Sequence, residues 1–276
     1  MSCCPPGSIG PRPLANKTPS GTTIKLTSKE GSTHKELPMY VVGVEESPST
    51  VLVVFSDVFG VDSGNQKVLC DTLSERMEST LVVMPDLFRG NPILGGWGLP
   101  AAITDFFQIL SVVWGCRTRI TIAAIEKDLV EILLPYLNKY EGAKISMVGM
   151  CFGGWVMGRA LALGEFSHIK CGVGIHPSWK LQVVYGEKEE ALAEAVKDKP
   201  ILFLVAKNDD LKVDTPIVQQ LSKQRGGIDE NKISIEFPDM IHGFVARGDA
   251  SDPTIAEQQE RALTLAIDFI KTEELK

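Results

Sequence analysis

A sharp turn at residues 149–154 constrains the fold more than any other feature of this sequence. Residues 144–148 form a β-branched and apolar run typical of a buried strand, and residues 155–163 form an apolar run typical of a helix. The turn between them reads Gly-Met-Cys-Phe-Gly-Gly. Small residues are needed on both sides of so tight a turn because its backbone atoms approach each other closely. The side chain at the apex is therefore pushed out of the turn.

The apical residue is Cys151, and it opens the predicted helix. Unpaired N–H groups and the helix dipole favour an anion at that position, so the thiolate is easier to reach than in a free cysteine. The pattern predicts an activated nucleophile. The alternative is that Cys151 is a small buried hydrophobic residue, as most cysteines are. The glycine frame favours the nucleophile.

Charge and cysteine usage limit the classes of partner and the compartment. A formal net charge of −7 and a pI near 5.2 argue against nucleic acid or an anionic membrane surface as the main partner. The amino terminus lacks the features of a signal peptide, and no run of 18 apolar residues predicts a membrane span. The six cysteines form no Cys-X-X-Cys pair. We expect a cytoplasmic protein with no metal and no cofactor.

Strands and helices alternate along most of the chain, which predicts a parallel sheet with right-handed crossovers. The first two predicted strands form an antiparallel edge. Pro135 is expected to kink or shorten the helix that contains it. Strands are predicted at residues 22–26, 39–44, 51–55, 81–84, 144–148, 171–175, 201–206 and 233–237, and helices at residues 68–77, 121–138, 155–163, 187–197, 216–225 and 254–276. The prediction is one doubly wound α/β domain at residues 21–276, preceded by an extended arm at residues 1–20.

The connection from Arg89 to Arg119 is long and rich in glycine and aromatic residues. Long connections in compact α/β domains often serve as lids or binding walls. Phe106 and Phe107 fit such a wall and an ordinary core equally well, because apolar spacing does not separate the two.

Polar residues that follow strand ends supply the candidates for catalysis, since chemistry in open α/β sheets collects at the carboxyl ends of the strands. The order nucleophile, acid, histidine is that of α/β-hydrolases. It selects Cys151, then Asp209 or Asp210, then His242. His176 precedes any suitable acid, so it fits a pocket wall or a structural role. No Gly-X-Ser-X-Gly motif is present, which excludes a serine hydrolase of the usual kind.

Motifs spread over most of the chain together resemble those of the dienelactone hydrolase family. The resemblance covers residues 39–276, and the Cys-Cys-Pro-Pro-Gly-Ser start resembles eukaryotic members in particular. The motifs are Gly-Met-Cys-Phe-Gly-Gly at 149–154, Asp-Val-Phe-Gly at 57–60, Pro-Asp-Leu-Phe at 85–88, Asn-Asp-Asp at 208–210 and His-Gly-Phe at 242–244. The resemblance implies an α/β-hydrolase fold and hydrolysis of esters or lactones by a Cys-Asp-His triad, with Asp209 rather than Asp210 as the acid.

Further roles come from the same resemblance. Family members carry a glutamate that modulates the protonation of the cysteine, and Asp57 occupies that position here. Bacterial members hold the carboxylate of the substrate with two arginines. Arg89 and Arg247 are the nearest equivalents, each displaced by one position, and a solvated surface role is the alternative for both. Independently of the resemblance, His176 and Trp179 follow the strand at 171–175 and are candidates to line the substrate pocket, with a structural role as the alternative for His176.

The expected reaction is attack of Cys151 on an ester or lactone of a small molecule, through a thioester intermediate. The backbone N–H groups of Phe152 and Val58 are expected to form the oxyanion hole. One rival is a non-catalytic hydrolase-like protein that binds a ligand or a partner. Another is a redox-sensing thiol, for which the sequence offers no obvious resolving cysteine. Both a monomer and a homodimer are compatible with the sequence.

Overall fold

The computed structural model of the chain describes residues 5, 7–10, 17–28, 36–94 and 113–276. Phe106 and Phe107 lie outside the described residues, and so do Cys3 and Cys4, the first two residues of the Cys-Cys-Pro-Pro-Gly-Ser start. The division into an arm at residues 1–20 and one domain at residues 21–276 therefore stays a prediction.

A single sheet of eight strands runs through the described part of the chain, in the order β1-β2-β4-β3-β5-β6-β7-β8. β1 pairs antiparallel with β2, and β2 with β4, whereas the pairs from β4 to β8 are parallel. The predicted parallel sheet with an antiparallel amino-terminal edge is confirmed. The strands are β1 Thr22–Leu26, β2 Leu37–Gly43, β3 Thr50–Phe55, β4 Thr80–Pro85, β5 Lys144–Met150, β6 Gly172–Ile175, β7 Ile201–Ala206 and β8 Ser234–Phe237.

The longer helices follow the prediction to within a few residues, whereas the short helices α6 and α9 were not predicted. The helices are α1 Gln66–Arg76, α3 Ile122–Asp128, α4 Leu134–Leu137, α5 Phe152–Ala162, α6 Leu181–Val184, α7 Glu189–Ala195, α8 Pro216–Gln224, α9 Phe244–Arg247 and α10 Pro253–Glu274, with a π-helical turn at Leu129–Leu133 and 3-10 turns at Gly164–Phe166 and Glu230–Lys232.

The helix predicted at residues 121–138 is helical from residue 122 to residue 137 but changes its hydrogen-bond pattern before Pro135, and a kink there stays a prediction. It consists of α3, the π-helical turn Leu129–Leu133 and α4, with Pro135 in the first turn of α4. Proline has no N–H to donate to the preceding turn, so the regular hydrogen-bond ladder is broken there. The side chain of Thr121 caps the start of α3 by accepting from the N–H of Ala124.

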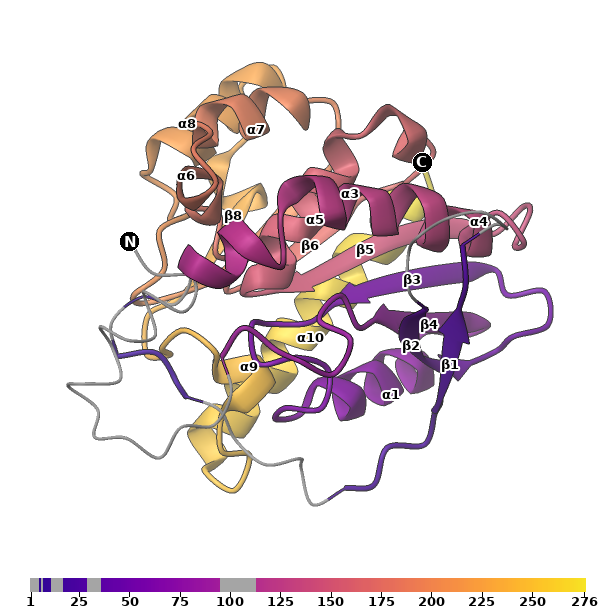
Figure 1. Cartoon of the computed structure of the whole chain (residues 1–276). Helices are drawn as coiled ribbons and strands as arrows, with labels where there is room; N and C mark the ends of the chain where they lie inside the picture. The colour runs from indigo at the N-terminus through magenta and orange to yellow at the C-terminus, as the bar shows by residue number, and fades with distance from the viewer. Residues whose placement is uncertain (1–4, 6, 11–16, 29–35, 95–112) are drawn as a thin grey trace.

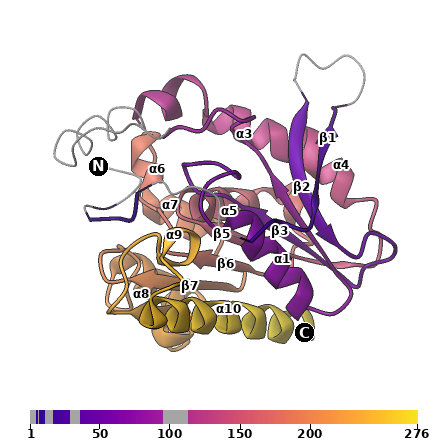
Figure 2. The ribbon, with the colours of Figure 1, turned by 90° about the horizontal axis from the view of Figure 1, so that it is seen from below.

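Helices cover both faces of the sheet. Figures 1 and 2 show α3, α5, α7 and α8 on one side, and α1 and α10 on the other. Alternate strand residues divide between the two layers. In β3, for example, Val51, Val53 and Phe55 join one apolar cluster, and Leu52 and Val54 join the other. Strands buried on both faces need a continuous apolar sequence, which is what β3, β4 and β7 have.

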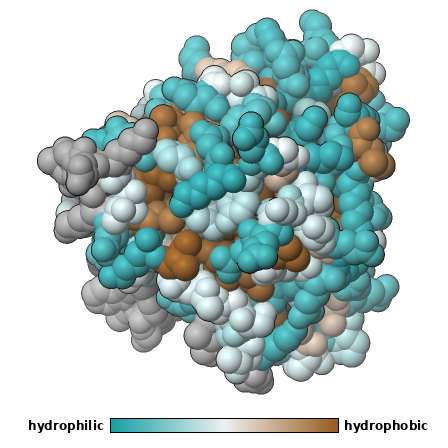
Figure 3. Space-filling model, turned by 90° about the vertical axis from the view of Figure 1, so that its right-hand side faces the viewer, coloured by the Kyte–Doolittle hydropathy of each residue, from teal (hydrophilic) through white to brown (hydrophobic). Residues whose placement is uncertain are grey.

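The face of the molecule drawn in Figure 3 is covered largely by hydrophilic residues, with hydrophobic ones visible between them. Trp114 is one of the large hydrophobic side chains that are exposed in the described part of the chain. Within the same residues, no helix combines the length and the apolar character that crossing a membrane requires.

Glu274, near the end of α10, ties that helix to two strands. Its carboxylate accepts from the hydroxyls of Thr50 and Ser146, both at 2.9 Å. We expect Glu274→Leu to leave both buried hydroxyls without an acceptor, and to lower the free energy of unfolding by about 1–3 kcal/mol. Urea denaturation measures the change. Glu257→Ala, at an exposed position of the same helix, is the control and should shift the value by less than about 0.5 kcal/mol. Equal stability of the two variants would contradict this interpretation.

Candidate active site

Cys151 lies in the turn between β5 and α5 and has an unusual backbone conformation. Its φ is 53° and its ψ is −114°. A non-glycine residue held in a sparsely populated region costs about 1–3 kcal/mol, so its surroundings must enforce it. A Cβ added at Gly149 would lie 2.1 Å from the carbonyl oxygen of Gly153. A Cβ added at Gly153 would lie 2.1 Å from the carbonyl oxygen of Phe55. Only glycine fits at these two positions, and the side chain of Cys151 is fully buried beside them.

Asp209 and His242 meet at the carboxyl ends of β7 and β8. The Oδ1 of Asp209 is 2.6 Å from the Nδ1 of His242, and both side chains are buried. A carboxylate only accepts, so Nδ1 carries the proton and Nε2 is left for other chemistry. Asp210 instead pairs with Lys180 at 2.6 Å, with 43% of its side chain exposed. Of the two candidate acids, the structure brings Asp209 to the imidazole.

Backbone contacts fasten the two loops that carry this pair. The side-chain oxygen of Asn208 accepts from the N–H of His242 at 2.7 Å. The N–H of Lys207 donates to the carbonyl of Met240 at 2.8 Å. In addition, Oδ2 of Asp209 accepts from the N–H of Ala206 at 2.6 Å. The imidazole is therefore fixed through its main chain as well as through its ring.

The pKa of His242 lies well above its ordinary value. Burial taken alone lowers the pKa of an imidazole, but the negative charges of Cys151 and Asp209 outweigh it. Nε2 is buried, and a side-chain hydrogen bond with Cys151 adds to the rise in the pKa. Cys151 is thus close enough for its charge to act on the ring and to favour the imidazolium.

A second imidazole, that of His176, packs edge-on against the first, with 4.9 Å between the ring centres. His176 is fully buried, and in the part of the chain that the structure describes neither ring nitrogen has a hydrogen-bond partner. Its φ is 38°, which is rare for a residue with a side chain. Burial and then the charge of His242 hold the pKa of His176 well below its usual range, so this ring is neutral.

Asp57 forms an ion pair with Arg247, and both side chains are fully buried. The Oδ1 of Asp57 also accepts from the N–H of Phe59 and from the side chain of Gln66, both at 2.9 Å. Burial raises the pKa of Asp57, Arg247 opposes that rise, and the negative charge of Cys151 adds to it. The carboxylate predicted to modulate the thiol therefore lies within range of its charge.

Ile9, in the amino-terminal arm, joins two of these residues. Its N–H donates to the carbonyl of His242 at 3.0 Å. Its carbonyl accepts from the Nε of Arg247 at 2.7 Å. This part of the arm therefore packs on the loop that carries the imidazole.

The side chains of Arg89 and Trp179 both contact other residues of the protein. Arg89 donates two hydrogen bonds to Asp128, at 2.7 and 2.8 Å, and one to the carbonyl of Glu36 at 3.2 Å. The two side chains of that ion pair line a hollow of about 300 Å³. Trp179 is buried and packs edge-on against Phe203, with 5.3 Å between ring centres. Contact of either residue with a substrate stays a prediction.

Three residues of this region were not predicted from the sequence: Ser178, Gln66 and Asn208. The Oγ of Ser178 lies 3.4 Å from the Sγ of Cys151. The one signal in the sequence is the preceding Pro177, which indicates a fixed turn after a strand. Which way a side chain points from that turn depends on the fold. Among the described residues, no cluster of three or more His, Cys, Asp or Glu side chains is placed to hold a metal ion.

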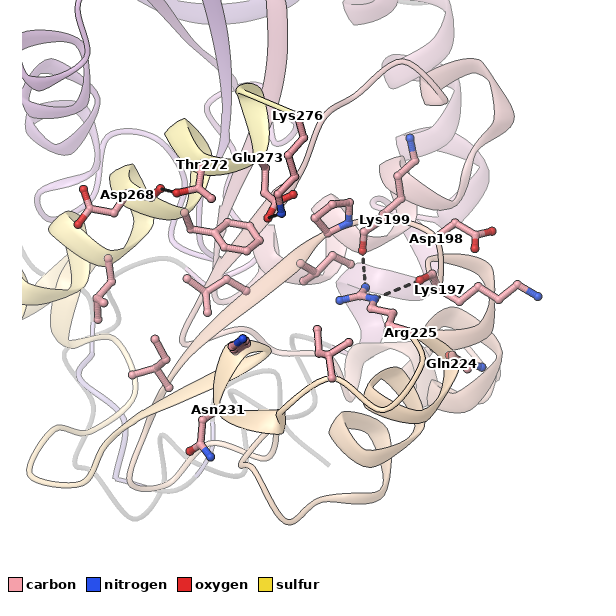
Figure 4. A pocket seen from close by; sticks show the side chains of 18 residues that line it. Lys197, Asp198, Lys199, Gln224, Arg225, Asn231, Asp268, Thr272, Glu273 and Lys276 are labelled. Atoms are coloured by element: carbon pink, nitrogen blue, oxygen red, sulfur yellow. Dashed lines mark hydrogen bonds and ion pairs between the residues drawn. The ribbon is translucent and has the colours of Figure 1, made fainter.

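A larger hollow, of about 760 Å³, lies at the amino ends of β7 and β8. Cys151 lies at the other end of the parallel strands, after the carboxyl end of β5. Figure 4 shows the side chain of Arg225 bonded to the segment that carries Lys197 and Lys199. Arg225 donates to the carbonyls of both residues, and the Nζ of Lys199 donates to the carbonyl of Ser167 at 2.5 Å. The side chains of Arg225 and Lys199 are therefore bound to backbone oxygens, and they stabilise the segment that leads into β7.

Known proteins share this sequence pattern. The sequence model of the dienelactone hydrolase family matches residues 37–274. Hydrolase pyvD of Aspergillus violaceofuscus is 28% identical over 243 residues, which cover 86% of this chain and 89% of that protein. The carboxymethylenebutenolidase homolog of Homo sapiens is 26% identical over 216 residues, which cover 77% of this chain and 78% of that protein.

Solved structures share the fold. A putative dienelactone hydrolase from Klebsiella pneumoniae superimposes with a TM-score of 0.57 at 19% identity, covering 88% of this chain and 98% of that one. Est1E from Butyrivibrio proteoclasticus gives a TM-score of 0.52 at 14% identity, covering 90% and 99%. The fold and strand order are those of an α/β-hydrolase. The chain belongs to the dienelactone hydrolase family, and it is a carboxylic ester hydrolase of small-molecule esters or lactones.

The raised pKa of His242 gives a direct test of its contact with Cys151. We expect Cys151→Ala to lower the pKa of His242, because the negative charge that favours the imidazolium is removed while burial still opposes it. NMR titration of the imidazole Cε1–H signals measures the change, and His242→Gln identifies the signal among the four histidines. Cys171→Ala is the control and should leave the titration as it is. Identical curves for wild type and Cys151→Ala would mean that the two residues do not interact.

Proposed function

We propose that this enzyme cleaves its ester or lactone through a Cys-Asp-His triad and a thioester intermediate. Cys151 is the nucleophile, His242 the general acid and base, and Asp209 the residue that orients His242. The main support is the 2.6 Å contact between Asp209 and His242, together with the action of the charge of Cys151 on the same ring. A fixed nucleophile, base and orienting acid are the parts that such a reaction requires.

The first half of the reaction transfers the acyl group to sulfur. The thiolate of Cys151 attacks the acyl carbon, and the electron pair of the carbonyl moves to oxygen. When the tetrahedral intermediate collapses, the bond from carbon to the ester oxygen breaks. The departing alkoxide takes the proton from Nε2 of His242 and leaves as an alcohol, or stays attached when the substrate is a lactone. His242 is then neutral and Cys151 carries the acyl group.

The second half releases the acid. Nε2 of His242 takes a proton from a water molecule as its oxygen attacks the thioester carbon. Collapse of this intermediate breaks the carbon–sulfur bond and releases the carboxylic acid. The thiolate of Cys151 and the imidazolium of His242 are both restored. The sum is one ester and one water converted to one acid and one alcohol.

The oxyanion of both intermediates is proposed to bind the backbone N–H groups of Phe152 and Val58. Phe152 is the first residue of α5, where N–H groups have no partner within the helix. Val58 follows Asp57 in the turn after β3. Removing one such donor typically costs on the order of 100- to 1,000-fold in rate.

Remaining roles concern the charge state of the thiol and the substrate. Asp57 is proposed to modulate Cys151, and His176 to form part of the pocket wall. Arg247 and Arg89 are the proposed contacts for a substrate carboxylate. Each is already paired with an aspartate, so binding a substrate carboxylate would have to compete with that partner. Trp179, on the loop after β6, is proposed as a more distant part of the same wall.

The proposed location is a reducing compartment, the cytoplasm, where the protein acts as a monomer or a homodimer. The described cysteines, Cys70, Cys116, Cys151 and Cys171, are all buried, and none of them forms a disulfide. Several cysteines that form no disulfide are typical of a protein in a reducing compartment.

Trapping the acyl-enzyme tests the nucleophile. Wild-type protein mixed with p-nitrophenyl acetate and quenched in acid is expected to carry one acetyl group on the peptide that contains Cys151. Intact and peptide mass spectrometry measure it. Cys151→Ala should carry none and lose hydrolysis, and Cys171→Ala should match wild type. A non-catalytic binding protein would show no acyl-enzyme and no turnover. An adduct on another residue would also contradict the proposal.

Substituting the neighbouring residues Asp209 and Asp210 one at a time distinguishes the orientation of His242 from a mere loss of negative charge. We expect Asp209→Asn to lower kcat on the order of 1,000- to 10,000-fold, because an amide favours the wrong tautomer of His242. Asp210→Asn removes the same charge one residue away and should stay within a few-fold of wild type, since Asp210 pairs with Lys180 at the surface. Steady-state kinetics on one activated ester measure both. Similar losses in the two variants would argue against the triad.

A further inference from the structure

We infer that Ser178 is a positioning residue for the nucleophile: its hydroxyl donates a hydrogen bond to the ionised sulfur of Cys151 and holds it in place for attack. The two atoms, Oγ and Sγ, are 3.4 Å apart. This inference rests on the proposed function, because the contact matters for catalysis only if Cys151 is the nucleophile.

The hydroxyl is held where it is by the backbone around it. The N–H of Ser178 donates to the carbonyl of Cys151 at 2.9 Å, and the N–H of Cys151 donates to the carbonyl of Ile175 at 3.1 Å. Pro177 fills the space beside Gly154, where an added Cβ would lie 2.5 Å from the proline ring. The loop after β6 and the turn before α5 are therefore locked together, and the hydroxyl stays beside the sulfur.

The chemistry of the two groups fixes the direction of the hydrogen bond. A thiolate has no proton and only accepts, whereas a hydroxyl has one proton to give. Ser178 is therefore the donor whenever Cys151 is ionised. A hydrogen bond to the charged form of an acid favours that form. Cys151 is fully buried, so the anion has lost its water and depends on such partners.

Another buried thiol in this chain, Cys171, has a serine beside it that does not donate to its sulfur. The S–H of Cys171 donates to the Oγ of Ser146 at 3.6 Å, and the proton of that hydroxyl goes to Glu274 at 2.9 Å. Burial dominates and raises the pKa of Cys171 to about 12. Burial without an opposite charge and a free donor therefore favours the protonated thiol. At Cys151 both are present, because the sulfur interacts with the charge of His242 and lies beside the hydroxyl of Ser178 from a different loop.

The test is the pH dependence of alkylation at Cys151, measured by iodoacetamide labelling and mass spectrometry of its peptide. We expect the labelling curve of Ser178→Ala to move to higher pH, and kcat/KM to fall about 10- to 100-fold, as for loss of one hydrogen bond to an ionised group. The change should appear in kcat rather than in KM. Ser178→Thr keeps a hydroxyl and should restore the curve towards wild type. Ser178→Gly removes the same hydroxyl and takes the place of Ser178→Ala if that variant does not fold.

Ser222→Ala is the matched control. Ser222 and Ser178 are each 7% exposed, and the hydroxyl of Ser222 donates to the carbonyl of Ile228 at 2.5 Å. Its loss removes a comparable hydrogen bond on α8, away from the sulfur, and should leave the labelling curve unchanged.

The outcomes separate this inference from the proposed function. A labelling curve of Ser178→Ala or Ser178→Gly that matches wild type would overturn the inference, whatever happens to the rate, since loss of a hydrogen bond to the ionised sulfur must move its proton equilibrium. If wild-type Cys151 labels no faster than Cys171 at neutral pH, the assignment of the nucleophile fails instead.

Discussion

The close approach of backbone segments around Cys151 is the constraint on which the site depends. Gly149 leaves room for the carbonyl of Gly153, and Gly153 leaves room for the carbonyl of Phe55 in β3. A side chain at either position would push α5 away from the central strands. That movement would displace the sulfur of Cys151, the residue that precedes α5, and the N–H of Phe152, the first residue of α5. The proposed nucleophile and the proposed oxyanion donor are therefore placed by the same packing that joins the helix to the sheet.

Electrostatics in this region follow from burial. Asp57, Arg247, Asp209 and His242 are all shielded from water, and an isolated buried charge costs several kcal/mol. Each therefore has an opposite charge in contact: Arg247 for Asp57, and His242 for Asp209. Because the charge of Cys151 acts on both His242 and Asp57, the protonation of one group depends on the others. Effects of single substitutions at these positions will not add, and double-mutant cycles are needed to apportion them.

Much of the fold was predictable because buried parallel strands have a distinctive sequence. The strand predicted at residues 201–206 coincides with β7, and the others agree to within a few residues. The positions of the candidate triad followed from the order of residues at strand ends. Their contacts did not. Asp209 and Asp210 are alike in sequence, and only the direction of the turn after β7 separates them. The roles of Ser178 and Gln66 depend on which segments the sheet brings together. The short helices α6 and α9 have too few residues for a periodic signal.

The contact of Ile9 with the loop of His242 has a consequence for how the protein is made. Arg247, which binds the carbonyl of Ile9, lies 238 residues further along the chain. A ribosome releases the amino terminus first, and the central strands emerge long before the last loop. The arm consequently has no docking partner until residues 242–247 have emerged, although the sheet can already begin to assemble. The imidazole loop therefore forms after the central strands, and until then the thiol lacks its proposed base.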